Sequence, residues 1–350
     1  MTRRVRVLVV DDSAFMRGAI ARVLSADPRL EVIGQAANGL EAVRLVAELG
    51  PDVVTMDFNM PGMNGAEATR AIMAHRATAI VMLSAHTREG AVATIEALGA
   101  GAVDFVTKPD GEVSVNLSAV REELVEKLFT AAKANLQPFS AVAAEPAAEP
   151  PISRRLRSVP RSMPPGMRVV VVAASTGGPA ALLHVVPELI IAQHTALIIV
   201  QHMPAGFTRA LAEQLAERAP FPVYEAQAGE ELSAGIAVVA PGGRHLLIER
   251  GCIALSDAAA VHGVRPAADV TFKSVAQTFG ARTVGVVLTG MGRDGALGLA
   301  AVRAAGGRTV AQDKGTSVVF GMPKAAIEMG VVEEVLPLVR VSSSVNKIIG

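Results

Sequence analysis

The feature that most constrains the fold of this chain is an alternation of short apolar runs with segments of helical period. Five β-rich apolar runs lie between Val5 and about Ala134: Val5–Val10, Val32–Ala36, Val53–Asp57, Ala79–Ser84 and Ala102–Thr107. Neighbouring parallel strands need helical crossovers, because the chain must return to the same edge before each strand begins. The alternation therefore predicts an α/β fold with a doubly wound parallel sheet of five β/α units.

The alternation stops over residues 135–166 and then resumes. This segment is rich in Ala, Glu and Pro, a composition that cannot build a core. Beyond it, strands are expected at Arg168–Ala173, Ala196–Val200, Ile236–Ala240 and Thr283–Leu288, with a hairpin that pairs His245–Glu249 with Cys252–Ser256. We therefore expect two doubly wound parallel-sheet domains, residues 1–134 and a Rossmann-like domain over 167–350, joined by a flexible linker over 135–166.

Composition and charge argue against several classes of protein. The 33 basic and 33 acidic residues cancel, so no global basic field exists to hold nucleic acid or an anionic membrane. Cys252 is the single cysteine and has no intrachain disulfide partner, which fits a reducing cytoplasm. The first apolar run ends at Asp11, before signal-peptide length, and no stretch approaches the roughly 18 apolar residues of a membrane span. We expect a cytoplasmic protein that binds no nucleic acid and inserts into no membrane.

Acidic side chains gather at the predicted strand ends of the first domain. Asp11 and Asp12 follow the first strand and Asp57 ends the third, so all three should meet at the carboxyl edge of the sheet, where ligands bind. Three clustered carboxylates need a counter-ion, and a hard divalent cation such as Mg²⁺ suits oxygen ligands. Ser84 and Lys108 end the next two strands and add a hydroxyl and a cation. Strand ending and helix capping explain any one of these residues, but the five together indicate a pocket for a phosphoryl group on a carboxylate.

The same residues stand in motifs that resemble the response-regulator receiver domain over about residues 4–130. These motifs are Asp11-Asp12-Ser13, Met56-Asp57-Phe58-Asn59-Met60-Pro61-Gly62-Met63-Asn64-Gly65, Ser84-Ala85 and Lys108-Pro109. The resemblance implies that Asp57 accepts the phosphoryl group. It implies a Mg²⁺ ion held by Asp11, Asp12, Asp57 and the carbonyl of Asn59, with Ser84 and Lys108 in contact with the phosphate.

Two further positions matter for this resemblance. Phe105 falls where receivers carry an aromatic switch residue, although its place in an apolar strand fits a plain core residue equally well. Asn64 stands where many receivers have Asp. Because Asn64 lies in the turn after the acceptor, we expect this difference to leave the chemistry unchanged.

In the second domain, Ser175 lies at a predicted turn from strand to helix. The strand Arg168–Ala173 runs into Ala174-Ser175-Thr176-Gly177-Gly178-Pro179, and a proline suits the first helical turn. The dinucleotide, P-loop and nucleophile-elbow motifs are all absent from this segment. What remains is a hydroxyl beside backbone N–H groups near a helix N-terminus, where a tetrahedral oxyanion is stabilised. This pattern indicates a serine nucleophile.

A serine nucleophile needs a base, and three of the seven histidines are candidates. His202 follows a predicted strand at the same sheet edge as Ser175, whereas His245 lies in the hairpin region and His262 in a polar loop; topology favours His202. Asp294, just past the strand Thr283–Leu288, has the best claim to orient the base. The weaker candidates for this acid are Asp257, Asp269 and Asp313. A cap, a strand end and a turn would explain each residue singly, but their joint placement favours a Ser-His-Asp triad.

From about residue 168 to 338 the chain resembles the catalytic domain of chemotaxis-type protein-glutamate methylesterases, which are also protein-glutamine deamidases. The motifs are Ala174-Ser175-Thr176-Gly177-Gly178-Pro179, Gln201-His202-Met203-Pro204, Ala240-Pro241-Gly242-Gly243-Arg244-His245, Thr289-Gly290-Met291-Gly292-Arg293-Asp294-Gly295 and Gly321-Met322-Pro323-Lys324-Ala325-Ala326. The resemblance implies that Ser175 is the nucleophile, His202 the general base and acid, and Asp294 its orienter. It places Thr176 and Met291 near the oxyanion.

Together the two resemblances imply a phosphorylation-activated serine hydrolase that demethylates glutamate methyl esters and deamidates glutamines on methyl-accepting chemotaxis receptors. The receptors would be its substrates, a chemotaxis histidine kinase its phosphodonor, and the esterase chemistry would need no cofactor. They also imply that the unphosphorylated receiver covers the esterase cleft and that phosphorylation relieves this inhibition.

Two other classes of protein remain as alternatives. A phosphorylation-controlled transcription factor would share the receiver, but residues 167–350 carry 15 basic and 14 acidic residues and do not form a small basic helix-turn-helix domain. A non-catalytic receptor-docking adaptor or phosphate sink would keep the motifs of the fold without reacting at Ser175.

Overall fold

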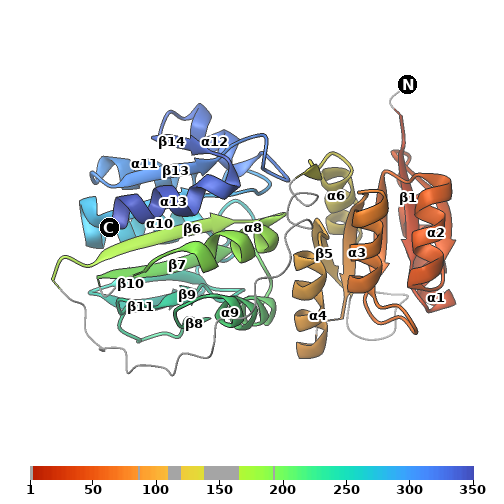
Figure 1. The fold of residues 1–350 in the computed structure, drawn as a ribbon, viewed down its shortest axis with the longest axis horizontal. Coiled ribbons are helices and arrows are strands. Elements are labelled where there is room, and N and C mark those ends of the chain that lie inside the picture. Colours follow the sequence, from red (N-terminus) through yellow and green to blue (C-terminus); the bar gives the residue numbers. More distant parts are fainter. Residues whose placement is uncertain (1–2, 86, 109–119, 138–164, 192–193) are drawn as a thin grey trace. The chain divides into compact units, whose positions relative to one another are not determined.

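The structure is a computed structural model that describes residues 3–85, 87–108, 120–137, 165–191 and 194–350. Contacts divide the chain into two compact units, Met1–Pro146 and Ala147–Gly350 (Figure 1). This division falls within the segment expected as a linker, of which residues 138–164 lie outside the described residues. No helix among the described residues is long and apolar enough to cross a membrane.

The first unit is a five-stranded parallel sheet in the order β2-β1-β3-β4-β5 (Figure 1). Its strands are β1 (Val5–Val10), β2 (Leu30–Ala36), β3 (Val53–Asp57), β4 (Ala79–Ser84) and β5 (Asp104–Thr107). Its helices are α1 (Ala14–Ser25), α2 (Gly39–Leu49), α3 (Gly65–His75), α4 (Arg88–Gly99) and α6 (Arg121–Ala131). Helices α2, α3 and α4 pack side by side and α1 packs on α6. The doubly wound sheet of five units is confirmed, with β2 and β5 each shifted by two residues at their start.

The start of α3 is fixed by a cap and by a close approach to β3. Asn64 Oδ1 accepts a hydrogen bond from the Glu67 amide at 2.9 Å, and Glu67 Oε2 accepts one from the Asn64 amide at 2.9 Å. Gly65 follows this capping box, and a Cβ atom there would lie 2.4 Å from the carbonyl oxygen of Asp57. Because only glycine fits this contact, the N-terminus of α3 lies directly against the end of β3.

The second unit contains a seven-stranded parallel sheet in the order β14-β13-β12-β6-β7-β9-β8 (Figure 1). Its strands are β6 (Arg168–Ala174), β7 (Thr195–Gln201), β8 (Val223–Glu225), β9 (Ala237–Val239), β12 (Thr283–Val287), β13 (Arg308–Gln312) and β14 (Glu334–Leu336). The helices are α8 (Gly178–Val185), α9 (Phe207–Arg218), α10 (Ala268–Phe279), α11 (Ala296–Ala304), α12 (Met322–Glu328) and α13 (Leu338–Ile349), with short 3₁₀ turns η1 (Val186–Glu188) and η2 (Gly280–Arg282). Strands β7 and β12 pair with opposite sides of β6, so the order of the sheet reverses at β6. Ligands of open α/β sheets bind at such a switch point.

The hairpin forms as expected: β10 (His245–Glu249) pairs with β11 (Cys252–Ser256). Arg250 and Gly251 connect them with φ values of 51° and 83°, the positive values that a tight hairpin turn needs.

Three strands of the large sheet, β8, β13 and β14, were not expected from the sequence. Strands β8 and β14 lie at its two edges and have three residues each, too few to show an alternating pattern. Strand β13 has only one strongly apolar residue, Val310, among Arg, Thr, Ala and Gln.

Helices α10 and α11 pack closely because glycine lies where they meet. A Cβ atom at Gly298 would lie 2.6 Å from the Cβ of Phe272, a fully buried residue of α10. Gly285 in β12 likewise leaves room for the Phe272 ring, because a Cβ atom at Gly285 would lie 3.2 Å from the nearest ring atom. These contacts fix the beginnings of both helices over the end of β12, where acidic residues of the candidate site lie.

Replacing Asn64 with Ala removes the cap of α3. We expect the variant to lose about 0.5–2 kcal/mol of stability in the first unit, because the Glu67 amide loses its acceptor. Asn64→Asp keeps an oxygen at this position and serves as the matched control. Chemical denaturation would measure the difference; equal stability of the Ala and Asp variants would show that the cap contributes nothing.

Candidate functional sites

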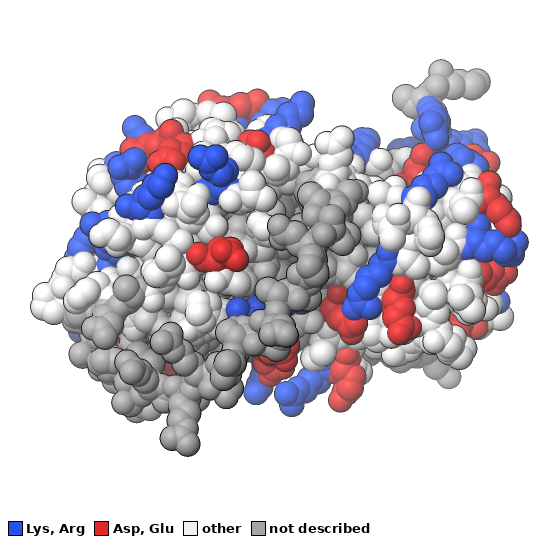
Figure 2. All heavy atoms as spheres, viewed as in Figure 1, with Lys and Arg blue, Asp and Glu red and all other residues white. Residues whose placement is uncertain are grey.

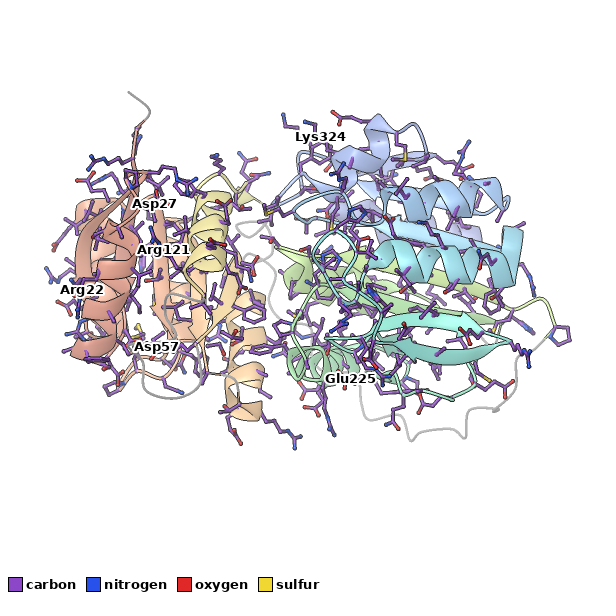
Figure 3. The ribbon with its side chains drawn as sticks, turned by 180° about the vertical axis from the view of Figure 1, so that it is seen from behind. Arg22, Asp27, Asp57, Arg121, Glu225 and Lys324 are labelled. Carbon is purple, nitrogen blue, oxygen red and sulfur yellow. The ribbon has the colours of Figure 1, made fainter. Side chains whose placement is uncertain are left out.

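The acidic pocket of the first unit lies at the carboxyl edge of its sheet. Asp11 follows β1, Asp57 ends β3, and both are buried, whereas Asp12 is exposed. Figure 3 labels Asp57 at one end of this unit and Asp27, which precedes β2, at the opposite end. Lys108 Nζ donates to Asp11 Oδ2 at 2.8 Å and to Asp57 Oδ1 at 2.7 Å. The sheet therefore brings one cation between two carboxylates from different strands.

One lysine does not neutralise this pocket. Burial raises the pKa of Asp57 above its ordinary value, and the Lys108 ammonium opposes the rise without cancelling it. Burial also works against the charge on Lys108, but the Asp57 and Asp11 carboxylates outweigh it and hold the pKa of Lys108 above its ordinary value. The ammonium stays charged, and the Asp57 carboxylate carries a charge that its surroundings only partly stabilise.

The donor set fits a divalent cation. Carboxylate oxygens of Asp11, Asp12 and Asp57 lie within 4.8 Å of one another, close enough to share one ion. Asn59, two residues past the end of β3, is exposed. Hard oxygen donors with an excess of negative charge are what Mg²⁺ prefers, and an exposed Asp12 leaves room for the waters that Mg²⁺ keeps.

Ser84 lies at the end of β4, at the same edge. Its side chain is 2 % exposed, and its hydroxyl accepts a hydrogen bond from Thr94 Oγ1 at 2.6 Å and donates toward the carbonyl of Gly90 at 3.1 Å. The hydroxyl is thus fixed between α4 and the strand end.

Phe105 is a buried residue of β5, 3 % exposed. Lys127 of α6 lies over its ring at 5.1 Å and donates to its carbonyl oxygen at 2.6 Å. The same ammonium pairs with Asp104 at 3.3 Å and with Glu123 at 2.9 Å. Phe105 therefore packs inside the unit beneath a lysine that two carboxylates hold.

In the second unit, Ser175 and His202 follow adjacent strands. Ala174 of β6 is in register with Gln201 of β7, and the His202 amide donates to the Ala174 carbonyl at 3.1 Å. From the other side, the Ser175 amide donates to the carbonyl of Thr289 at 3.1 Å. A Cβ atom at Gly290 would lie 2.8 Å from the Cβ of Ser175, so the chain after β12 runs directly against the serine. The serine and the histidine sit at the switch point of the sheet.

Asp294 is buried, 2 % exposed, and each of its oxygens accepts two hydrogen bonds. Oδ2 lies 2.7 Å from His202 Nε2 and accepts from the Ala268 amide at 2.5 Å. Oδ1 accepts from the amides of Asp269 at 2.9 Å and Gly295 at 3.0 Å. Burial by itself raises the pKa of Asp294, but the bond from His202 and those from the amides outweigh it and hold the pKa below its ordinary value. The acid is therefore ionised and fixed beside the histidine.

A second aspartate–histidine pair adjoins the first. Asp269 Oδ1 accepts from the Gly295 amide at 3.0 Å and the Gly298 amide at 2.6 Å, while Oδ2 lies 3.0 Å from His262 Nε2. Asp294, which lies shortly before α11, thus caps the start of α10. Asp269, which lies in the first turn of α10, caps the start of α11. His262, Asp269 and Asp294 also lie close enough to share an ion. Amide and imidazole donors already occupy these carboxylate oxygens, so hydrogen bonding accounts for the cluster. The sequence ranked Asp269 as a weak candidate and missed this capping role.

The other candidate residues lie elsewhere. His245 is buried, with Nε2 3.1 Å from the Ala259 carbonyl, and its Nδ1 accepts from the Ala267 amide at 3.1 Å, so both ring nitrogens serve the backbone. Asp257 pairs with Arg244 on the surface, and Asp313 caps the turn at Thr316. Among these histidines, His202 is the one that follows the strand beside Ser175 and pairs with Asp294.

Two residues expected near an oxyanion lie in the segments that meet at Ser175. Thr176 is 8 % exposed, and its carbonyl accepts from Thr289 Oγ1 at 3.0 Å. Met291 follows Gly290, which packs on Ser175, and is 48 % exposed. Thr176 lies in the segment after β6 and Met291 in the segment after β12, and hydrogen bonds of Thr289 hold these two segments together.

Comparison with known proteins gives a consistent result. Residues 170–345 match the family described as CheB methylesterase, and residues 7–116 match the response regulator receiver domain. The chain is 47% identical to a protein-glutamate methylesterase/protein-glutamine glutaminase of Symbiobacterium thermophilum, over 99% of this chain and 98% of that protein. It is 41% identical to the protein of the same name from Thermotoga maritima, over the whole of both chains. The crystal structure of the Thermotoga maritima CheB methylesterase catalytic domain covers 52% of this chain and 98% of its own at 39% identity, with a TM-score of 0.50.

The acidic pocket predicts a response to Mg²⁺. At neutral pH, added Mg²⁺ should raise the melting temperature of the receiver unit, because it neutralises clustered carboxylates. Asp57→Asn should melt higher than wild type without Mg²⁺, since a carboxyl with a raised folded pKa destabilises the fold once ionised. The same variant should respond less to Mg²⁺.

Thermal melting with and without Mg²⁺ measures both effects. Glu48→Gln, which removes an exposed carboxylate on α2, is the control and should melt and respond as wild type does. An undiminished Mg²⁺ response in Asp57→Asn would place the ion elsewhere.

Proposed function

The chain belongs to the CheB methylesterase family and joins that esterase to a response regulator receiver domain, and from this premise we propose which of its residues carry the activity. As a member of this family it is a hydrolase, a protein-glutamate methylesterase and protein-glutamine glutaminase regulated by phosphorylation in chemotaxis. Three regions are proposed: the receiver over 1–134, a linker over 135–166 and the catalytic domain over 167–350. The matched ranges and the division of contacts support an arrangement of two domains on either side of this linker.

We propose Ser175, His202 and Asp294 as the catalytic triad. The observation that carries this proposal is the 2.7 Å contact between His202 Nε2 and Asp294, made by a histidine whose backbone is bonded to the residue before Ser175. An ionised Asp294 beside Nε2 keeps the ring proton on that nitrogen. Nδ1 is then the nitrogen left to accept the proton of Ser175. The imidazole thus works in the reverse orientation to triads in which the acid binds Nδ1.

The reaction begins when Ser175 Oγ bonds to the ester carbon of a glutamate γ-methyl ester while its proton passes to His202. The carbonyl π electrons move to oxygen, and we propose that backbone amides around Thr176 and Met291 stabilise this oxyanion. As the intermediate collapses, the C–O bond to the methoxy group breaks and His202 returns the proton, so methanol leaves. Water then attacks the acyl-enzyme by the same route and releases glutamate. A glutamine amide loses ammonia in the corresponding step.

In the receiver, we propose that Asp57 accepts the phosphoryl group. Asp11, Asp12 and the Asn59 carbonyl would hold Mg²⁺ together with Asp57; when bound, the ion neutralises charge on the transferring phosphoryl group. Lys108, already bonded to Asp57, would contact the phosphate, and Ser84 would bind it through its hydroxyl. We propose Phe105 as the aromatic residue that responds to phosphorylation. Because Phe105 is buried beneath Lys127, such a response would require its side chain to repack.

The proposed partners are methyl-accepting chemotaxis receptors as substrate and a chemotaxis histidine kinase as phosphodonor, both met in the cytoplasm. A role in DNA binding is disfavoured by charge. Basic side chains lie interspersed with acidic ones over the described residues of both units on the face in Figure 2. A non-catalytic adaptor is disfavoured because it would not need an ionised acid held against a partly buried histidine.

The function is tested by methanol release from methylated receptor, with and without a small phosphodonor and Mg²⁺. Wild type should release methanol faster with the phosphodonor, Ser175→Ala should release none, and Asp57→Asn should not respond to the phosphodonor. Release by Ser175→Ala at the wild-type rate would remove Ser175 from the mechanism. No release by wild type from verified substrate would favour the adaptor.

Replacing Asp294 with Asn tests the orientation of the base. An Asn oxygen can still accept the Asp269 and Gly295 amides, but its NH₂ group then faces the Ala268 amide and His202 Nε2. His202 would carry its proton on Nδ1 and lose its role as base, so turnover should fall by up to about 10⁴. The control is Asp257→Asn, which removes a surface pair only. Steady-state turnover near the wild-type value in Asp294→Asn would exclude Asp294 from the triad.

A further inference from the structure

Gln201, the last residue of β7, connects the backbones of the proposed nucleophile and base. Its side chain is buried, 2 % exposed, and Nε2 donates to the carbonyl oxygen of Ser175 at 2.9 Å and to that of His202 at 3.3 Å. Both partners are carbonyl oxygens and can only accept. The amide nitrogen must therefore face them, which fixes how the side chain is turned.

The other end of the same amide is unsatisfied. Oε1 is buried and has no hydrogen-bond partner among the described residues. It lies at the start of α8, where a Cβ atom at Gly178 would come within 2.1 Å of it. Glycine at position 178 is thus required for Gln201 to hold this position.

This arrangement is costly as a packing solution. A buried amide oxygen without a donor destabilises the fold, and an apolar side chain of similar length would avoid that cost. What an apolar side chain cannot do is donate to two carbonyls at once. The Ser175 carbonyl also accepts the Gly178 amide at 2.7 Å, so the Gln201 bond ties the turn after β6 to the residue after β7.

We propose that Gln201 is a positioning residue of the esterase, which sets the distance and orientation between Ser175 and His202 by bridging their carbonyls. This inference rests on the proposed triad and adds a residue that does not touch the substrate. Register pairing aligns the strands only as far as Ala174 and Gln201, and the two reacting side chains begin one residue later. The bridge extends that alignment past the strand ends. A misplacement of about 1 Å between reacting groups costs about 10²-fold in rate.

The test compares Gln201→Met with wild type in the full-length, phosphodonor-activated protein. Met keeps the length of the side chain and removes both donors. We expect kcat for methanol release to fall about 10- to 100-fold, with KM within about twofold of wild type, because substrate contacts are unchanged. The rate of inactivation by a serine-directed phosphonate should fall by a similar factor, since it reports Ser175 reactivity directly.

The matched control is Gln214→Met. Gln214 lies in α9 and also has a buried Oε1 without a hydrogen-bond partner, but it bridges no residue of the site. It should react and turn over as wild type does, whatever its melting temperature. If Gln201→Met does not fold at the assay temperature, Gln201→Asn takes its place, because it keeps an amide that is one methylene too short to reach both carbonyls.

Three outcomes decide the matter. A loss in kcat and in phosphonate reactivity for the Gln201 variant alone supports the positioning role. Wild-type kcat and reactivity in a folded Gln201 variant, even one with a lowered melting temperature, overturn it and leave only a packing role. The proposed triad fails separately, if Ser175→Ala keeps its activity.

Discussion

The esterase unit depends on the stabilisation of one buried negative charge. Asp294 is almost fully enclosed, and an unpaired carboxylate in such a place would be strongly destabilising. Its four hydrogen bonds come from three backbone amides and one imidazole. The amides are those of Ala268 and Asp269 at the start of α10 and of Gly295 directly before α11, and the imidazole is that of His202, directly after β7. The fold brings three segments together to satisfy the charge. The three amides fix the carboxylate that contacts His202, so the stability of this corner and the orientation of the imidazole have one origin.

The buried carboxylates of the receiver are, in contrast, only partly stabilised. Asp11 and Asp57 share a single lysine, and burial keeps the pKa of Asp57 raised, so the charge there is left partly unsatisfied. A site that takes up a cation and a phosphoryl group needs this deficit, because binding then supplies what the apo fold lacks. Asp294 is fixed by donors that belong to the fold itself, whereas the Asp57 carboxylate has one lysine that it shares with Asp11. Both carboxylates follow parallel strands of similar sheets, and the difference lies in how many donors surround each.

The sequence predicted the site residues whose positions follow from the ends of strands. Asp57, Ser175 and His202 come at or directly after buried strands, and the parallel sheets carry them to one edge, as the pattern required. The sequence favoured His202 over His262 by its place after a strand. It did not show that both histidines pair with a buried aspartate, which is visible only in the fold. Edge strands β8 and β14 were too short to predict. Gln201 is visible in the sequence as a polar residue at the end of an apolar strand. No sequence pattern, however, indicates a side-chain amide that donates to two main-chain carbonyls.

Mutual capping of α10 and α11 has a consequence for how this enzyme can degenerate over evolution. Asp294 and Asp269 each cap the helix that begins beside the other, so a change at either position removes hydrogen bonds that hold the start of a helix. Within the described parts of the chain, the Ser175 side chain makes no hydrogen bond that caps a helix. A descendant that is inactive but still folds is therefore reached more readily by substitution of the serine than by substitution of the aspartate. Chains of this type that have lost their chemistry should retain the aspartate long after the hydroxyl has gone.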